Sequence, residues 1–211
     1  MDTLNPPLPQ GFTPIPAGML ATIVTCLEMT AAPAARPTPP ADGLSIDHWP
    51  APSIEAYRAL YRQIGEEWLW MSRVVMKDDE LAAILSDPAV EIYTLMQDGQ
   101  RVGLLELDFR QEGECELAFF GVDQAAIGKG AGRFLMNAAI AHAWAKPIRR
   151  FWVHTCNLDH PAALSFYQRS GFTAYDRMIE VFEDPRLTGK LRADAATHAP
   201  VIAPAVQVPK P

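Results

Sequence analysis

The feature that most constrains the fold of this chain is a glycine-dense loop between an expected strand and an expected helix. Gly128, Gly130 and Gly132 alternate with Lys129 and Ala131. Glycines at this spacing leave backbone N–H groups unshielded by side chains, and the helix that follows adds free N–H groups and the positive end of its dipole. The loop therefore predicts an anion-binding site at a β–α junction. The alternative is a glycine-rich turn that binds nothing.

Two familiar phosphate-binding patterns do not fit this loop. A P-loop needs four residues between its first glycine and Gly-Lys-[Ser/Thr], whereas six separate Gly121 from Gly128, and Gly130 follows the lysine. A dinucleotide-binding loop opens a parallel sheet near the start of its domain and has an acidic residue about 20 positions further on. Here an antiparallel meander is expected before the loop, and that position falls within residues 146–150, none of which is acidic. Both patterns are excluded.

The rest of the chain predicts helices, then an antiparallel meander, then alternating strands and helices. Ser53 is suited to cap a helix, and apolar residues recur at helical spacing from Ile54 to Ile64. Asp98 and Gly99 give a strong hairpin signal between two alternating segments. This order predicts an α/β fold with a mixed sheet. The expected helices are 54–64, 78–85, 130–144 and 161–170, and the expected strands are 44–49, 89–96, 101–110, 115–122, 150–155 and 173–182.

Both ends of the chain differ in composition from its middle. Eleven of the 19 prolines lie between Pro6 and Pro52, and the last residues again include prolines. Residues 20–29 are β-branched and free of proline, which predicts one extra strand at a sheet edge. We therefore expect a proline-rich N-terminal arm with one extra strand at 1–43, the main domain at 44–185 and a mobile C-terminal tail at 186–211.

Composition narrows the possible partners and compartment. Lys and Arg total 18 against 25 Asp and Glu, a net charge of −7 with no basic run, so nucleic acid is not an expected partner, whereas a positively charged amine is compatible. The three cysteines follow no clustered spacing and suggest a reducing compartment. The apolar run at 19–27 is too short to cross a membrane, and no basic residue precedes it as in a signal peptide. We expect a cytoplasmic protein without membrane association.

A second motif downstream of the loop gives it a specific meaning. Residues 159–172 read Asp-His-Pro-Ala-Ala-Leu-Ser-Phe-Tyr-Gln-Arg-Ser-Gly-Phe. The glycine loop, its helix and then Ala-x-x-Phe-Tyr-x-x-x-Gly-Phe resemble the GNAT superfamily of acetyl-CoA-dependent N-acetyltransferases over residues 44–185. The resemblance implies a mixed, mostly antiparallel twisted sheet flanked by helices and splayed between its fourth and fifth strands. It also implies acetyl-CoA as co-substrate and direct attack by a primary amine in a ternary complex.

The resemblance also implies where the cofactor binds, with two departures from the usual pattern. The family loop begins with Gln or Arg, where this chain has Ala125, and Ile127 replaces a common Arg before the first glycine. An Asn often found seven residues before the tyrosine is His160 here. Backbone donors are expected to hold the pyrophosphate in spite of these changes. The implied cofactor-binding residues are Phe120, Gly121, Val122, Ile127, Gly128, Lys129, Gly130, Ala131, Gly132, Arg133, His160 and Tyr167.

The chemistry of acetyl transfer suggests roles for two groups near the expected thioester. The thiolate leaving group benefits from a proton, and the tetrahedral oxyanion needs hydrogen-bond donors. The resemblance makes Tyr167 the acid that faces the sulfur, and the backbone N–H of Val122 the oxyanion donor. The competing interpretation of Tyr167 is a core aromatic residue on an amphipathic helix.

The attacking amine must also lose a proton to an acceptor in the cleft. Glu116 leads the candidates, because its place on the strand before the loop matches the family's glutamate. Glu114 shares its face by the two-residue period of a strand, and Glu106 and Asp108 lie on the neighbouring strand. The competing interpretation of each is a solvated strand face.

Two further groups of residues have competing interpretations. One group borders the expected acceptor site and either lines an apolar acceptor pocket or packs in the core: Trp68, Trp70, Met71 and Arg73. The other group contains potential metal ligands whose spacing matches no zinc signature, so that no metal is expected: His142, His154, His160 and Cys156.

The leading hypothesis is an enzyme that acetylates a small-molecule or peptide amine. The acceptor remains open among polyamines, amino acids, antibiotics and protein amino groups, and a homodimer is compatible with the extra strand. The alternatives are a transferase with another acyl donor, a catalytically silent acyl-CoA-binding sensor, and a structural β–α domain that binds no ligand.

Overall fold

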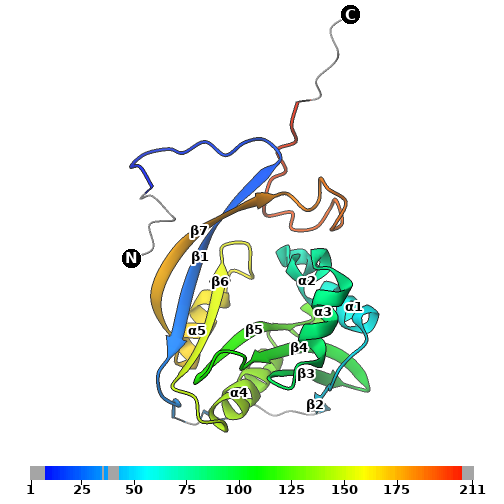
Figure 1. Ribbon diagram of the computed structural model, residues 1–211, viewed down its shortest axis with the longest axis vertical. Coiled ribbons are helices and arrows are strands. Elements are labelled where there is room, and N and C mark those ends of the chain that lie inside the picture. The colour runs from blue at the N-terminus through cyan, green and yellow to red at the C-terminus, as the bar shows by residue number, and fades with distance from the viewer. Residues whose placement is uncertain (1–7, 35, 38–42, 206–211) are drawn as a thin grey trace, which may run out of the picture.

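A seven-stranded mixed sheet organises the molecule (Figure 1). The computed structural model describes residues 8–34, 36–37 and 43–205. The strand order is β2-β3-β4-β5-β6-β1-β7, and every neighbouring pair is antiparallel except β5 and β6. The strands are β1 Met19–Met29, β2 Leu44–His48, β3 Val90–Gln97, β4 Gln100–Asp108, β5 Glu114–Val122, β6 Arg150–Cys156 and β7 Thr173–Glu183. The predicted mixed, mostly antiparallel α/β fold with an additional N-terminal strand is confirmed.

Helices cover both faces of this sheet. Ser53 caps the first helix as predicted, since its hydroxyl accepts a hydrogen bond from the N–H of Ala56. No helix among the described residues has the length and apolar character needed to cross a membrane. The helices are α1 Ile54–Gly65, α2 Ser72–Val75, α3 Asp78–Ser86, α4 Ala131–Trp144 and α5 Ala163–Ser170, with short 3-10 turns η1 Glu66–Trp68 and η2 Gln124–Ala126.

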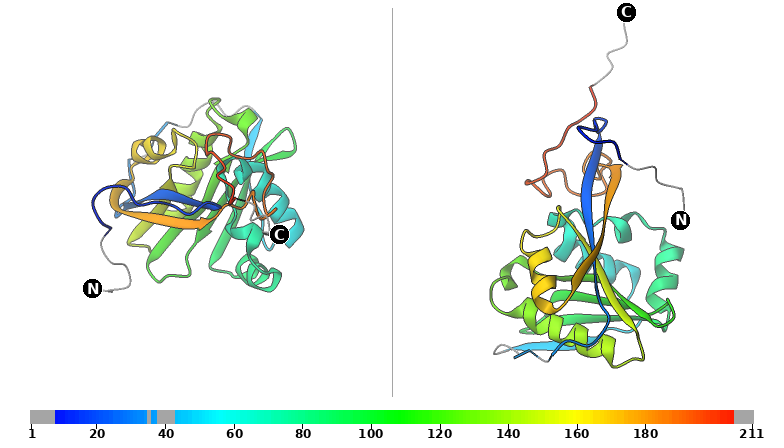
Figure 2. Two further views of the ribbon diagram at one scale, coloured as in Figure 1. Left: turned by 90° about the horizontal axis from the view of Figure 1, so that it is seen from above. Right: turned by 90° about the vertical axis from the view of Figure 1, so that its left-hand side faces the viewer.

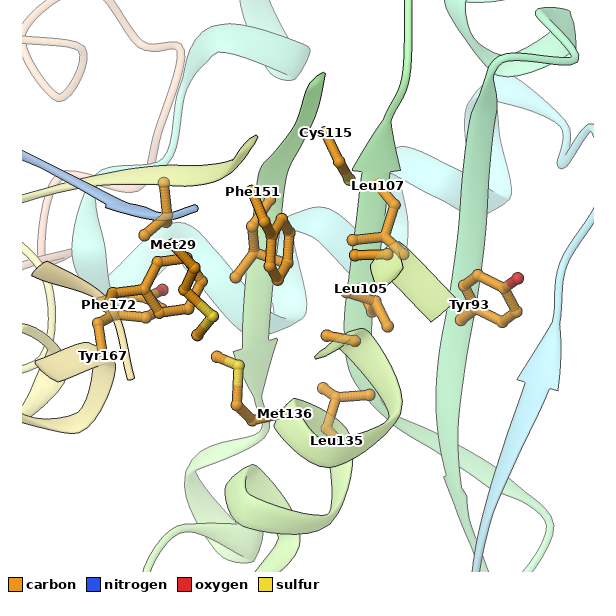
Figure 3. Close-up of a cluster of buried hydrophobic side chains, with 14 of the residues drawn as sticks. Met29, Tyr93, Leu105, Leu107, Cys115, Leu135, Met136, Phe151, Tyr167 and Phe172 are labelled. Carbon is orange, nitrogen blue, oxygen red and sulfur yellow. The ribbon is translucent and has the colours of Figure 1, made fainter. Parts of the chain in front are cut away.

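The alternation of side chains along the strands produces two hydrophobic cores. On one face, Leu105 and Leu107 of β4 pack with Leu135 of α4 (Figure 3). On the other face, Leu104 packs with α1 and α3, where Tyr57 is fully buried. Leu104 and Leu105 thus serve opposite cores, as the two-residue period of a strand requires.

The N-terminal strand is central to its part of the sheet, which corrects the expectation of an edge strand. β1 pairs with β6 on one side and with β7 on the other. Its Val24, Cys26, Leu27 and Met29 are buried. These apolar residues point to both faces, which suits an interior strand, but the pairing is long-range and has no local signal. Figure 2 shows β1 and β7 projecting together beyond the other strands.

The parallel pair β5 and β6 is joined only over a short distance. Glu114, Cys115 and Glu116 pair with residues 150–152, and the later parts of the two strands pair with each other no further. The sheet therefore splays at the end of β5 that leads into the glycine loop. The splay lies between the fourth and fifth strands of the main domain, as the family resemblance implied.

The structure also differs from the expected mobile tail at 186–211. Arg186 is almost fully buried, forms a bidentate ion pair with Asp184 and donates from Nη1 to the carbonyl oxygens of residues 195, 196 and 199. Leu191 packs with Leu69 and Leu158 in a third apolar cluster. One arginine thus holds a segment that has no periodic apolar pattern. Residues 206–211 of the predicted tail, and 1–7, 35 and 38–42 of the predicted arm, lie outside the described residues.

Candidate active site

The glycine loop has the backbone geometry that the sequence predicts. Gly128 and Gly130 have φ angles of +80° and +88°, in the left-handed region that favours glycine, and Gly130 is the N-cap of α4. A Cβ atom added to Gly128 would meet nothing within 4 Å. Gly128 therefore faces open space and serves the backbone conformation, whereas a Cβ atom on Gly132 would contact Phe166 at 3.9 Å. The free N–H groups at the start of α4 lie directly after the loop.

A cavity of about 620 Å³ opens beside this loop at the splay between β5 and β6. Its volume falls within the range of ligand-binding pockets, roughly 300–1,000 Å³. Two of the expected cofactor residues, Lys129 and Ala131, do not line it. The others all do: Phe120, Gly121, Val122, Ile127, Gly128, Gly130, Gly132, Arg133, His160 and Tyr167.

The cavity is lined from both faces of the sheet. Phe120 points to the face covered by α4 and α5, where its ring centroid lies 6.2 Å from that of Tyr167. Gly121 faces α1 instead, since a Cβ atom added there would lie 2.5 Å from Cγ2 of Ile64. Tyr167 lines the cavity from the first face, and His154 of β6 lines it from the second. Two molecules can therefore approach one point from opposite sides of the sheet.

Tyr167 is a buried tyrosine of α5 that lines the cavity. It is 7% exposed, and its hydroxyl has no hydrogen-bond partner among the described residues. Burial, assisted by the negative charge of Asp159, raises the pKa of Tyr167, so its hydroxyl is protonated at neutral pH. The hydroxyl is therefore available as a donor within the cavity.

The backbone of Val122 offers a donor at the splay. The N–H of Asp123 donates to the carbonyl oxygen of Val102 on β4, at 2.7 Å. Successive N–H groups of a strand point to opposite sides within the sheet plane, so the N–H of Val122 points away from β4 and toward the gap. The role of this N–H as oxyanion donor stays a prediction.

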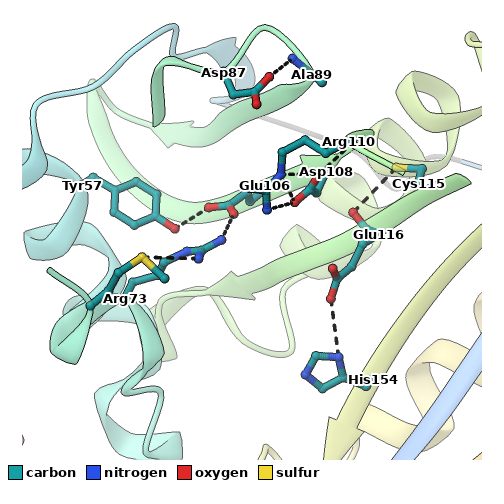
Figure 4. A network of polar contacts seen from close by, with 11 residues as sticks. Tyr57, Arg73, Asp87, Ala89, Glu106, Asp108, Arg110, Cys115, Glu116 and His154 are labelled. Carbon is teal, nitrogen blue, oxygen red and sulfur yellow. Dashed lines mark hydrogen bonds and ion pairs between the residues drawn. The ribbon is translucent and has the colours of Figure 1, made fainter. Parts of the chain in front are cut away.

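Glu106, one of the candidate bases, is fully buried in a polar network on the α1 face (Figure 4). Its carboxylate accepts hydrogen bonds from the Tyr57 hydroxyl and from Nη2 of Arg73, each at 2.5 Å. Burial acts to lower the pKa of Arg73, but the charge of Glu106 outweighs it, and the pKa lies above its usual value. Glu106 is thus fixed as the counter-ion of Arg73, which does not line the main cavity.

Two other candidate carboxylates are also paired with arginine. Asp108 accepts from Nη2 of Arg110 at 2.5 Å, and Glu114 accepts from Nη1 of Arg150 at 3.0 Å. Burial acts to raise the pKa of Asp108, and the hydrogen bonds from Arg110 outweigh it, so that the pKa lies below its usual value. Both carboxylates are less suited to accept a proton than an unpaired one.

Glu116 differs from the other three, because no arginine pairs with it. Burial and then the charge of Asp108 raise the pKa of Glu116 to about 7. Its ion-pair contact is with His154, with 3.6 Å between Oε1 and Nδ1 (Figure 4). Glu116 does not line the main cavity but a second one of about 490 Å³, together with Asp108, Arg110, Gln111 and Trp152.

The remaining sequence candidates are divided between the cavity and the surrounding core. Trp68, Trp70 and Met71 line the main cavity, so they belong to the site as well as to the packing around it. Nδ1 of His160 accepts from the N–H of Ala162 at 3.1 Å. Within the described part of the chain, no group of three or more potential ligands could hold a metal ion.

Three residues of the site were not identified from the sequence as site residues. Asp159 lines the cavity and accepts from Nε1 of Trp70, at 3.3 Å, which ties η1 and its flanking loop to the end of β6. Asp159 is the first residue of the second sequence motif, and this position could have indicated that it belongs to the site. Arg169, which lies within the same motif, also lines the cavity, as does His154, which has no local signal for that placement.

Comparison with known proteins identifies the family. The model of the acetyltransferase (GNAT) family matches residues 54–172, which are 119 of the 211 residues. The chain belongs to this family, whose members generally use an acyl-CoA as co-substrate. No curated protein matches the sequence.

Solved structures share the fold at low sequence identity. A GCN5-related N-acetyltransferase from Sphaerobacter thermophilus aligns with a TM-score of 0.56 at 15% identity over 82% of this chain and 53% of its own. A putative GNAT acetyltransferase from Novosphingobium aromaticivorans gives 0.53 and 16% over 82% and 70%. An aminoglycoside acetyltransferase from an uncultured soil metagenomic sample gives 0.54 and 17% over 68% and 97%. The chain spans about half of the Sphaerobacter protein and 63% of a functionally unknown protein from Staphylococcus epidermidis.

Proposed function

We propose that this protein is an N-acetyltransferase that moves the acetyl group of acetyl-CoA to a primary amine by direct attack in a ternary complex. The observation that carries the proposal is the cavity through the splayed sheet, with Tyr167 on one face and the Glu116–His154 pair at the other. A thioester and an amine entering from opposite faces meet without an acetylated enzyme intermediate.

The cofactor is proposed to lie on the α4 and α5 side. Backbone N–H groups of the loop from Gly128 to Gly132 and the start of α4 would bind its pyrophosphate. Arg133 lines the cavity there, and its buried Nε has no partner among the described residues, so an anionic ligand would supply one. The adjacent Arg169 adds a second cation to the same lining.

The proposed reaction assigns a role to three groups of the protein. The amine nitrogen attacks the thioester carbon, and the N–H of Val122 stabilises the developing oxyanion. The C–S bond breaks, and Tyr167 gives its proton to the sulfur. The amine also loses a proton. Glu116 promotes this step, either by accepting the proton directly or by acting through an intervening group.

The acceptor side suggests an amine with an apolar part. Trp68, Trp70 and Met71 line it, together with Leu158. A half-buried aromatic lining favours an amine with a partly apolar body, while the net charge of −7 favours a cationic one. The three free cysteines are compatible with the reducing cytoplasm that we propose as the compartment.

Two measurements test this function. Acetyl-CoA should raise the melting temperature, and a panel of amines should then release free thiol in its presence. Tyr167→Phe should lower kcat about 100-fold or more with little change in acetyl-CoA affinity. Tyr93→Phe is the matched control, because it removes a hydroxyl that binds Glu91, outside the cavity. Stabilisation without turnover on any amine would instead indicate a silent acyl-CoA sensor.

A further inference from the structure

The position of Glu116 leaves a gap between the carboxylate and the cavity in which the amine would react. Glu116 lines the second cavity, not the main one. His154 lines the main cavity from the neighbouring strand β6, and its Nδ1 lies 3.6 Å from Oε1 of Glu116. The imidazole therefore stands between the carboxylate and the reaction space, and Figure 4 shows the Glu116 side chain turned toward it.

We propose that His154 is the base that takes the proton of the acceptor amine, and that Glu116 orients its ring and stabilises the imidazolium ion. The inference rests on the proposed acetyl transfer and identifies the group that faces the amine. In this arrangement Nε2 of His154 receives the proton, and Nδ1–H donates to Glu116. Hydrogen bonds of this kind are often long without substrate and shorten in the reacting complex.

The proposed reaction conserves protons and electrons. An ammonium ion that becomes an amide loses two protons, one before the C–N bond forms and one as the tetrahedral intermediate collapses. His154 accepts the first and passes it to solvent, which its 52% exposed side chain permits. The second compensates for the proton that Tyr167 gives to the departing thiolate. The net products are the amide, the free thiol of coenzyme A and one proton in solution.

The charges around the pair leave the imidazole as the natural partner of Glu116. Asp108 and Glu106 of β4 face Glu116 and are compensated by Arg110 and by Arg73 of α2. The two nearest arginines are thus occupied by other carboxylates.

The charged neighbours of His154 on its own side of the sheet are Arg150 of β6, which is paired with Glu28 and Glu114, and Asp176 of β7, which is the cross-strand partner of Cys26. The His154 ring stacks on Trp152 at 6.3 Å between centroids, and Cys26 of β1 is its cross-strand partner. At 3.6 Å, Glu116 is the carboxylate in ion-pair reach of this ring among the described residues. A neutral imidazole beside this carboxylate can take up a proton and gain an ion pair.

Substitution of His154 with a residue that cannot accept a proton tests the inference. His154→Gln should reduce kcat/KM for the amine about 100-fold or more, remove the acidic limb of the pH–rate profile and leave the thermal shift with acetyl-CoA unchanged. His48→Gln is the matched control, since His48 lies on the edge strand β2 and should retain wild-type kinetics. Imidazole in solution should restore part of the activity of His154→Ala.

Glu116→Gln separates the two members of the pair. If Glu116 acts through His154, the double variant should lose no more activity than His154→Gln alone, because the two residues work as one unit. Wild-type kcat/KM and an unchanged acidic limb in His154→Gln would overturn the inference and assign direct proton transfer to Glu116, while acetyl transfer itself would stand. Wild-type protein that acetylates no amine would overturn the proposed function and this inference with it.

Discussion

Replacement of Glu106 by glutamine tests the structural role that the fold gives to this candidate base. Glu106 is fully buried, and its two oxygens accept from Tyr57 and Arg73 at 2.5 Å. Glutamine keeps the size and a hydrogen-bond acceptor for Tyr57 but removes the negative charge. The Arg73 guanidinium, whose side chain is only 9% exposed, would then be buried without a counter-ion.

The expected loss of stability follows from that uncompensated charge. Removing one partner of a buried ion pair costs about 3–5 kcal/mol, because the remaining charge stays desolvated. Nε of Arg73 already lacks a partner among the described residues, so the network has no spare acceptor. With about 2–4 °C per kcal/mol for a domain of this size, the melting temperature should fall by roughly 6–20 °C.

Urea unfolding at pH 7 measures the effect directly. Glu106→Gln should lower the unfolding midpoint at a constant m-value. The matched control is Glu80→Gln, which removes the same charge from an exposed pair with Lys77 at 3.9 Å and should change stability by less than about 1 kcal/mol. The double variant Arg73→Met, Glu106→Leu should recover much of the loss, since it removes both charges. A loss below about 1 kcal/mol in Glu106→Gln would refute the reasoning.

Three further predictions concern Glu116, the loop and the C-terminal segment. The pKa of Glu116 is about 7 in the folded protein, against the ordinary value of 4.5 that applies to the unfolded chain. The folded state therefore binds the proton more tightly. The resulting stabilisation is complete below pH 4.5 and is lost as the pH rises through 7. Urea unfolding should therefore find Glu116→Gln more stable than wild type at pH 8, by roughly 3 kcal/mol at most, and no different below pH 4.5; equal stability at both pH values would contradict this. Gly130→Ala should weaken acetyl-CoA binding as measured by calorimetry, because alanine is strained by about 1–2 kcal/mol at φ +88°. The control is Gly99→Ala, at φ +77° in a remote hairpin, which should lower stability without affecting binding. Arg186→Met should release residues 195–199, seen as faster amide hydrogen exchange there, and unchanged exchange would mean that the arginine network does not hold the segment.

Local patterns in the sequence predicted the elements and the position of the glycine loop well. Alternation, capping and turn residues act over a few positions, so they located the β3–β4 hairpin, the Ser53 cap and the loop at Gly128–Gly132. The shared face of Glu114 and Glu116 followed from the two-residue period of a strand. These features depend on neighbours in the chain, which a single sequence contains.

The features that the sequence did not reveal depend on distant partners. The apolar pattern of β1 is compatible with several positions in the sheet. It therefore could not predict that β1 lies between β6 and β7. Arg73 and Glu106 are paired across two elements, so their charges gave no hint that one candidate base is a structural counter-ion. The contact of His154 with Glu116 likewise depends on the register of β5 against β6. Physical reasoning from residue types suggested the chemistry, and the fold shows which candidate carboxylate is not paired with an arginine.

Initial-rate kinetics with acetyl-CoA and an accepted amine both varied test the central claim most directly. If the splay between β5 and β6 holds both substrates at once, double-reciprocal plots should intersect, and the N-acetylated amine should appear in step with free thiol. Parallel lines would indicate a covalent acetyl-enzyme and contradict direct attack in a ternary complex. Thiol release without any acetylated amine would contradict amine acetylation itself.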